Sequence, residues 1–418
     1  MRGREEYDSL VRNLYQTVGK KYVRIAGKYV TMNVSEGAQY SKEDKLAVLS
    51  YAGVTNSYTT SSIKRLKGLG GIDKGDKSVP TEKTVIDSIR FVDSKTLFQK
   101  MREANNHIIQ QAVKNNELKD ELIAALDIHN VYRHTKIPMS GKRKRKCSDI
   151  RTVVGRKPKN GACYAHEYMT VQNIKMKNEP TYVLAFERVL PLRNVTNIAR
   201  NLLREAETKT GSKIKLIIAD GDFDDIDTMK MFMEEEKHFV VRADQDGKVK
   251  KVMEKVKENK NEYHVEYGYI KGNKKNFAKV NLVILDVEWL KKHGIKYPLK
   301  KKEYITFFTD LYPEEDETIE HFCLKIAIFY KKRWGIETGY RDISDFEAKT
   351  HSLSDSVRLF LYLQAILLYN IWVGVNFMYK DDPIRKKYFR DGISKDFIRF
   401  LIEQWIIREF TEKKGYDP

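Results

Sequence analysis

The sequence predicts a mixed α/β core that follows an all-α N-terminal region. Apolar runs typical of buried strands begin near Glu121, amphipathic helical segments alternate with these runs, and the residues before them show helical spacing only. The chain has 418 residues, enough for two or three domains. The expected parts are a helical domain at 1–118, an α/β domain at 119–240 and 303–418, and an insertion at 241–302.

Charge and composition narrow the classes of partner. Lys and Arg number 77 against 58 Asp and Glu, which gives a net charge of +19. An excess of this size indicates a polyanion: DNA, RNA or an anionic membrane. The three cysteines, Cys147, Cys163 and Cys323, form no CxxC pair, which excludes a disulfide framework and argues against structural zinc. Because the N-terminus also lacks an apolar signal, we expect a cytoplasmic protein.

One apolar segment, residues 359–379, is long enough to span a bilayer. Gln364, Asn370 and Asn376 interrupt it, so no apolar run within it approaches the length of a membrane span. A membrane span is the alternative, but a helix buried in a protein core, with its amides bonded to neighbours, is the favoured interpretation.

The N-terminal region contains two short predicted helices between residues 41 and 69. Ser41 is a suitable N-cap for the first helix, and Gly68 lies at the end of the second. The second helix carries hydroxyl and cationic side chains, namely Thr59, Thr60, Ser61, Ser62, Lys64 and Arg65. This pair resembles a helix-turn-helix, whose side chains contact phosphates and base edges. An ordinary helical hairpin is equally compatible with the pattern. A further helix starts at Pro80 and Thr81.

Strands and helices alternate in the predicted α/β core. Strands are expected at 121–131, 163–176, 180–190, 213–223, 238–244 and 304–311. Helices are expected at 194–211, capped by Asn194 and ended near Gly211, at 224–236, and over much of 318–379. The insertion is lysine-rich and strand-prone, with 17 Lys and Arg against 8 Asp and Glu, which suits a surface that faces phosphates.

Carboxylates are the strongest chemical signal in this core. P-loop, GxGxxG, GxSxG and HExxH motifs are absent from the sequence. Asp127 lies near the end of one predicted buried strand, and Asp220 ends another. Two such carboxylates at adjacent strand ends, joined by a third from a helix, would bind Mg²⁺ or Mn²⁺. The alternative is that each Asp caps a turn. His129 and His134 are more simply explained as polar neighbours or DNA contacts than as zinc ligands.

The third carboxylate is expected from the segment IFYKKRWGIETGYRDI. Tyr330, Arg333 and Glu337 lie at i, i+3 and i+7, so they share one face of a predicted helix. An Arg one turn from a metal-binding Glu, with a Tyr beyond it, can hold the phosphate that flanks a scissile bond.

These residues resemble the Y-R-E-K signature of DDE transposases from prokaryotic insertion sequences, the IS-four-like group of archaeal type. IADGDF is similar to the family's second-Asp strand and places the acid at Asp220. ALDIHNV resembles its first-Asp strand and places the acid at Asp127. ETGYRDI, followed by AKTHS, Arg358 and LLYNIW, is similar to the stretch after the Glu. The resemblance covers about residues 119–379.

The resemblance implies an RNase H-like fold, a mixed five-stranded sheet with helices on both faces. It also implies a metal-binding catalytic triad of Asp127, Asp220 and Glu337, two Mg²⁺ (or Mn²⁺) ions, and a β-rich insertion. Ser344 stands where the family has the signature Lys. Arg341 and Lys349 are the candidates to supply the missing charge.

A basic stretch between the first two predicted strands supports a nucleic-acid partner. Residues 133–159 contain eleven Lys and Arg against one acid, including the run Lys142, Arg143, Lys144 and Arg145. We favour contact with DNA; the alternatives are a localisation-like signal and a solvated loop. Trp289 could stack a flipped base, as the family can do, but a core position is the favoured interpretation for Trp289 and Trp334.

The function expected from the resemblance is metal-dependent cleavage at transposon ends and strand transfer into target DNA. The freed 3′-OH would attack the target directly, without a covalent enzyme intermediate. The implied partner is double-stranded DNA, as terminal inverted repeats and as target, bound by a homodimer on paired ends. Two alternatives stay open: a catalytically inactive or domesticated DNA-binding regulator, and a metal-dependent nuclease that only hydrolyses.

Overall fold

The chain forms two compact units, Met1–Glu117 with Gly339–Pro418, and Leu118–Thr338. The computed structural model describes residues 2–69, 79–133, 154–159, 162–174, 180–191, 193–245, 247–297, 303–352, 354–389 and 392–412. The expected DNA contacts Lys142, Arg143, Lys144 and Arg145, together with His134, lie outside the described residues.

The first unit is built from helices. Its described helices are α1 (Arg2–Tyr29), α2 (Lys42–Val54), α3 (Thr59–Leu69), α4 (Glu82–Arg90), α5 (Ser94–Lys114), α12 (Asp355–Met378), α13 (Pro383–Tyr388) and α14 (Lys395–Glu412). The N-cap predicted at Ser41 is confirmed, and the helix start predicted at Pro80 and Thr81 also has an N-cap. Ser41 accepts a hydrogen bond from the backbone N–H of Asp44, and the Asp44 carboxylate accepts one from the N–H of Ser41, which forms a capping box. Thr81 caps α4 in the same way through the N–H of Thr84.

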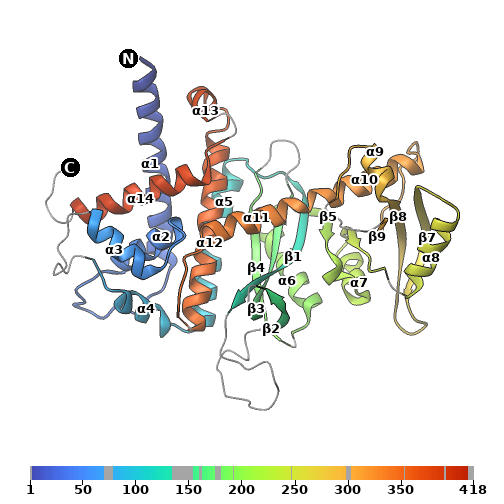
Figure 1. Ribbon diagram of the computed structural model, residues 1–418, viewed down its shortest axis with the longest axis horizontal. Coiled ribbons are helices and arrows are strands. Elements are labelled where there is room, and N and C mark those ends of the chain that lie inside the picture. Colours follow the sequence, from blue (N-terminus) through green and yellow to red (C-terminus); the bar gives the residue numbers. More distant parts are fainter. Residues whose placement is uncertain are drawn as a thin grey trace, which may run out of the picture. The chain divides into compact units, whose positions relative to one another are not determined.

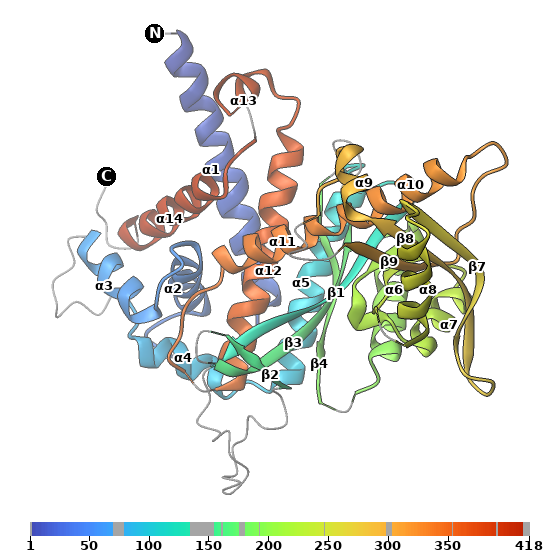
Figure 2. The same cartoon turned by 45° about the vertical axis from the view of Figure 1, so that its right-hand side comes forward.

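Helix α12 lies at the centre of this unit, beside α5 in both views (Figures 1 and 2), and also contacts α1, α2 and α4. Within the described residues it is the one helix long and apolar enough to cross a bilayer, yet 83% of its most apolar window is buried inside the protein. Its amides are bonded as the core-helix interpretation predicts. Gln364 donates to Ser50 Oγ at 3.2 Å, and Asn370 donates to Asn105 Oδ1 at 2.7 Å.

The division of the chain differs from the expected domain boundaries. The sequence assigned 303–418 to the α/β domain, whereas residues from Gly339 onward belong to the helical unit. The reason is that α12 is apolar on all sides and therefore needs other helices around it. Helices α1, α2, α4 and α5 provide that surrounding.

The second unit is built on one sheet. Its described strands, nine in number, are β1 (Glu121–Arg133), β2 (Val154–Lys159), β3 (Ala162–Asn173), β4 (Val183–Val189), β5 (Lys213–Ala219), β6 (His238–Arg242), β7 (Tyr263–Gly272), β8 (Phe277–Asp286) and β9 (Tyr304–Thr309). The strand order is β2-β3-β1-β5-β6-β9-β8-β7, with β4 also paired to β3. The accompanying helices are α6 (Val195–Thr210), α7 (Ile226–Glu234), α8 (Gly247–Glu258), α9 (Val287–Lys292) and α10 (Ile319–Lys332). Helix α11 (Trp334–Asp345) begins in this unit.

Strand directions change across the sheet. β4, β3 and β1 are antiparallel neighbours, whereas β1, β5 and β6 run parallel to one another. Beyond β6, the strands β9, β8 and β7 continue the sheet in antiparallel fashion. The lysine-rich insertion contributes α8, β7, β8 and α9, so its strands extend the same sheet through the pairing of β8 with β9.

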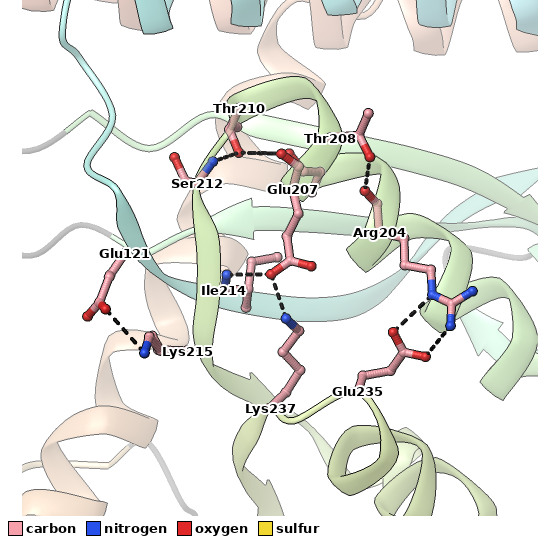
Figure 3. A network of polar contacts seen from close by, with 11 residues as sticks. Glu121, Arg204, Glu207, Thr208, Thr210, Ser212, Ile214, Lys215, Glu235 and Lys237 are labelled. Carbon is pink, nitrogen blue, oxygen red and sulfur yellow. Dashed lines mark hydrogen bonds and ion pairs between the residues drawn. The ribbon is translucent and has the colours of Figure 1, made fainter.

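The start of β5 is held by a polar network between α6, β5 and the end of α7 (Figure 3). Glu207 of α6 accepts hydrogen bonds from the backbone N–H of Ile214 at 2.8 Å and from Lys237 Nζ at 2.5 Å. Arg204 binds both carboxylate oxygens of Glu235, at 2.6 and 2.9 Å. The predicted caps of α6 are present: Asn194 at its start and Gly211, in the left-handed conformation, at its end. This network fixes one end of the strand that leads to Asp220.

Candidate active site

Asp127 and Asp220 lie side by side on adjacent parallel strands. The pairing of β1 with β5 ends at Leu126 and Ala219, and the two acids are the next residues on their strands. Asp127 lies within β1, which continues past it to Arg133 in its pairing with β3, two residues beyond the predicted end of this strand at 131. Its backbone is therefore held by the pairing of Asp127 with Thr170 of β3, and only 6% of the residue is exposed.

Asp220 opens a tight turn directly after β5. The turn is one 3₁₀ helix, Gly221–Phe223, and Asp220 Oδ1 accepts a hydrogen bond from the backbone N–H of Asp222 at 3.0 Å. Phe223 is fully buried, which anchors the turn against the core. The local fold therefore fixes the backbone that carries the second carboxylate.

Arg333 bridges Glu337, on α11, and Asp127, on β1. It lies at the junction of α10 and α11, so the single helix expected over Tyr330–Glu337 is interrupted at this residue. Its Nη2 donates to Glu337 Oε1 at 2.8 Å, and its Nη1 donates to Asp127 Oδ2 at 3.5 Å. The guanidinium also lies over the ring of Tyr330, 5.3 Å from its centre. The three side chains predicted to share one face are thus brought together with Asp127.

The electrostatics of the site resist the accumulation of negative charge. Burial, together with the negative charge of Asp220, raises the pKa of Asp127 to about 7 although the positive charge of Arg333 acts against both. Burial also raises the pKa of Asp220, together with the charge of Asp222. Burial lowers the pKa of Arg333, but Tyr330 and the surrounding acids outweigh burial and raise it. The carboxylates therefore need positive charge in order to be ionised together.

The raised pKa of Asp127 predicts a pH-dependent stability in metal-free buffer. The folded chain holds the Asp127 proton more tightly than the unfolded chain does, so the protonated side chain adds to the free energy of unfolding. This gain in stability is fully present below the pKa of a carboxyl group in the unfolded chain, and it is lost as the pH rises through about 7. We expect the melting temperature in EDTA to fall more steeply with rising pH for the wild type than for Asp127→Asn. Identical curves of melting temperature against pH for the two proteins would contradict this expectation.

Arg242 belongs to the site, although the sequence analysis did not select it. Ala219 pairs with Val241, so Arg242, the last residue of β6, lies at the level at which Asp220 follows β5. Its charge lowers the pKa values of Asp220 and Tyr330. In the sequence, the sign that could have identified Arg242 is its position at the end of a predicted buried strand. Only the register between β5 and β6 shows that Asp220 is the acid beside it.

The donor set fits a divalent metal ion. All three acids offer hard oxygen ligands, and the carboxylates of the buried Asp127 and the half-buried Asp220 lie close enough together to need a cation. Among the described residues, no group of three or more His, Cys, Asp or Glu side chains is arranged to hold a metal ion as it stands. The reason is that Glu337 is paired with Arg333, and its side chain is 57% exposed. Metal binding by all three acids therefore requires a rearrangement of the Arg333 contacts.

The described residues that were predicted to contact DNA outside this site belong to the helical unit. Lys64 and Arg65 are exposed on α3, and Arg65 is paired with Glu403 at 2.9 Å. Thr59 and Ser62 are buried, so half of the hydroxyl groups expected on the DNA-facing side of α3 point inward. Arg341 is exposed on α11 and Lys349 is exposed after it. The DNA-binding roles of Lys64, Arg65, Arg341 and Lys349 stay predictions.

Trp289 lies in the protein core, as predicted, and not on a surface where it could stack against a flipped base. It is 2% exposed, and its ring contacts the rings of Tyr263 and His293 at 5.1 and 4.8 Å between centres. Trp334 is partly buried, with its ring edge-on to Tyr297 at 5.2 Å.

Two of three comparisons with known proteins gave a match. Residues 182–371 match the family model described as Transposase DDE domain, a range that includes Asp220, Arg333 and Glu337 but not Asp127. The comparison with curated proteins gave no match. Among solved structures, the fold is similar to that of a piggyBac transposase in a synaptic complex with hairpin DNA. The TM-score is 0.53 and the identity 13%, over 98% of this chain and 82% of that chain.

Proposed function

We propose that this chain is a DDE transposase that cleaves DNA at the ends of a mobile element and joins the freed 3′ ends to target DNA. The observation that carries the proposal is the side-by-side placement of Asp127 and Asp220, with Arg333 joining Asp127 to Glu337. The match of 182–371 to the transposase DDE domain and the likeness to a transposase structure support it. The assignment to the IS-four-like group with the Y-R-E-K signature is part of this proposal.

The sheet supports the same proposal. Within the nine-stranded sheet, five strands in the order β4-β3-β1-β5-β6 include three antiparallel neighbours followed by two strands parallel to β1, which is the mixed arrangement expected of an RNase H-like core. In such a sheet, acids at one level of neighbouring parallel strands are brought together by the register alone. We propose the RNase H-like fold for this part of the unit.

Each side chain of the site has a proposed role. Asp127, Asp220 and Glu337 would hold two Mg²⁺ or Mn²⁺ ions, which when bound activate the attacking oxygen and stabilise the leaving 3′ oxygen. Arg333 would hold the phosphate beside the scissile bond, since its Nε is buried and has no hydrogen-bond acceptor among the described residues. Arg242, beside Asp220, would add a second positive charge for the same phosphate.

Strand joining is the experiment that tests the proposal. A labelled duplex that ends in the inverted repeats flanking the coding region is incubated with the full chain, Mg²⁺ and a supercoiled target plasmid. We expect nicking at the repeat ends and transfer of the label to the plasmid. Nicking without transfer would indicate a nuclease that only hydrolyses. Binding without either reaction would indicate a DNA-binding regulator and would overturn the proposal.

The proposed partner is double-stranded DNA, bound by a dimer on paired ends with α3 as the recognition helix. Lys64 is the cleanest test because it is exposed, whereas Arg65 is paired with Glu403. Lys64→Ala should weaken binding to the repeat ends and lower the slope of log K against log salt by about one, as expected for the loss of one phosphate contact. Fluorescence anisotropy over a salt series measures both quantities.

The matched control for this prediction is Lys95→Ala, an exposed lysine on α5 in the same unit. Point substitutions are required because α12 is buried against helices of the N-terminal segment, so deletion of 1–117 would expose its apolar surface. Equal losses in the two variants would show that α3 has no special role.

A further inference from the structure

The segment that follows Asp220 is held by the lysine-rich insertion. Asp224, four residues after Asp220, has a side chain that is only 4% exposed and forms an ion pair with Lys271 of β7. Its other oxygen, Oδ2, accepts a hydrogen bond from the backbone N–H of Asp244 at 2.7 Å. Both oxygens of the Asp224 carboxylate are therefore used to attach the turn to its surroundings.

The environment of Lys271 shows that this pair is built into the fold. Its ammonium also lies 4.6 Å from the centre of the Phe308 ring on β9, and its side chain is mostly buried. Burial raises the pKa of Asp224, while the bonds from Asp244 and Lys271 lower it. Removal of Lys271 would thus leave a buried carboxylate without its counter-charge, which is a costly arrangement.

A second set of contacts attaches the hairpin formed by β7 and β8 to α7, the helix that follows the Asp220 turn. At the β7–β8 turn, Asn276 accepts a hydrogen bond from Lys230 Nζ at 2.7 Å and donates one to Asp227 Oδ1 at 3.3 Å. Both partners belong to α7. The backbone of Gly272 approaches Ile226 so closely that a Cβ there would lie 2.7 Å from Ile226 Cδ1, and its φ of +112° also favours glycine.

These contacts form a brace between the insertion and the turn that carries the second acid. We propose that Lys271 is a positioning residue for Asp220, acting through Asp224. The turn 220–224 is short and internally hydrogen-bonded, from the N–H of Asp224 to the carbonyl of Gly221 at 3.1 Å. Fixing Asp224 therefore restricts where the Asp220 carboxylate can lie. The inference rests on the proposed function, because it assumes that Asp220 is a metal ligand.

The brace gives the insertion a role that its charge alone does not predict. The sequence suggested a surface that binds phosphates, and Lys271 is one of the insertion's basic residues. In the structure its charge is directed at Asp224 rather than at solvent. Groups that orient metal ligands in this indirect way change metal affinity about 10- to 100-fold when removed.

The test measures metal affinity and not only activity. Mn²⁺ alone is titrated into the full-length chain by calorimetry, for the wild type, Lys271→Met, Lys271→Arg and Lys275→Met. We expect Lys271→Met to weaken Mn²⁺ binding about tenfold or more. Lys271→Arg should keep most of the affinity, because it retains the charge. Lys275→Met, which removes an exposed lysine from the same hairpin, should match the wild type.

Non-additivity separates positioning through Asp224 from a general loss of charge. Asp224→Asn can still accept the bond from the Asp244 N–H, and we expect it to weaken Mn²⁺ binding like Lys271→Met. The double variant Asp224→Asn/Lys271→Met should bind no more weakly than either single variant. It contains no unpaired buried charge, so it provides the measurement if Lys271→Met does not fold. Additive losses would overturn the proposal.

The outcomes also separate this proposal from the proposed function. A wild type that binds no Mn²⁺, with Asp220→Ala indistinguishable from it, would overturn the proposed function. A wild type that binds Mn²⁺ through Asp220, together with a folded Lys271→Met of equal affinity, would overturn the positioning role alone. Faster hydrogen exchange of the amides of 221–224 in Lys271→Met is the second expected result, and unchanged exchange would also contradict the role.

Discussion

Asp127→Ala, Asp220→Ala and Glu337→Ala should each abolish both nicking and strand joining. Loss of one ligand removes or misplaces an ion on which the nucleophile and the leaving group both depend, so the rate should fall at least about 10³-fold. Affinity for duplex DNA without metal should be equal or higher, because the site loses an anion that repels phosphate. Gel assays of nicked and joined products, with anisotropy for binding, measure the two effects.

Asp222 is the control residue for the Asp220→Ala experiment. Asp222 is exposed, so Asp222→Ala should retain most of the activity. Asp224 and Asp225 are poor controls, because the first forms the buried pair with Lys271 and the second caps α7 through the N–H of Thr228. Wild-type joining by Asp220→Ala, or loss of joining only in Asp222→Ala, would show that Asp220 is not the ligand.

Removal of Arg333 should affect stability and activity together. Arg333→Ala would leave Asp127 buried beside Asp220 without the cation that now contacts it, at a cost of about 3–5 kcal/mol to the metal-free fold. Mg²⁺ should restore part of the lost stability, since it supplies positive charge to the same carboxylates. Nicking should still fall about 10²-fold or more, because the phosphate has lost its proposed partner.

Thermal melts with and without Mg²⁺ measure the first effect, and the nicking assay measures the second. Arg333→Lys should give intermediate values, since an ammonium cannot bridge Asp127 and Glu337 as the two ends of a guanidinium do. Lys331→Ala, which removes a nearby cation that bonds the Gly294 carbonyl, is the control. A melting temperature of Arg333→Ala that does not respond to Mg²⁺ would contradict the shared role of these groups.

The sequence predicted the order of the elements well, because apolar runs and caps are local signals. Ser41, Thr81 and Asn194 all cap the helices that their positions indicated. The same runs pointed to Asp127 and Asp220, two acids that the pairing of β1 with β5 brings together. The predicted strand 121–131 lacks only the last two residues of β1, Tyr132 and Arg133, because that end of the strand is defined by its pairing with β3.

What could not be predicted depends on contacts between residues far apart in the chain. The ion pair between Arg333 and Asp127 joins residues 206 positions apart, and Arg242 is placed beside Asp220 by the register of β5 and β6. The grouping of 339–418 with the N-terminal helices is of the same kind. An apolar segment such as α12 predicts burial, but it does not show which elements surround it.

The amides of α12 have a consequence for how uniquely the helical unit folds. A helix that is apolar on every side could turn about its axis or slide by one turn with little change in buried area. Gln364, Asn370 and Asn376 each bond a different partner, namely Ser50, Asn105 and the backbone at Ile393, at successive levels along the helix. Any rotation or slip would leave buried amides unbonded, at a cost of about 1–3 kcal/mol for each group. These amides therefore select one register of α12 from several of similar apolar contact, even if each adds little net stability.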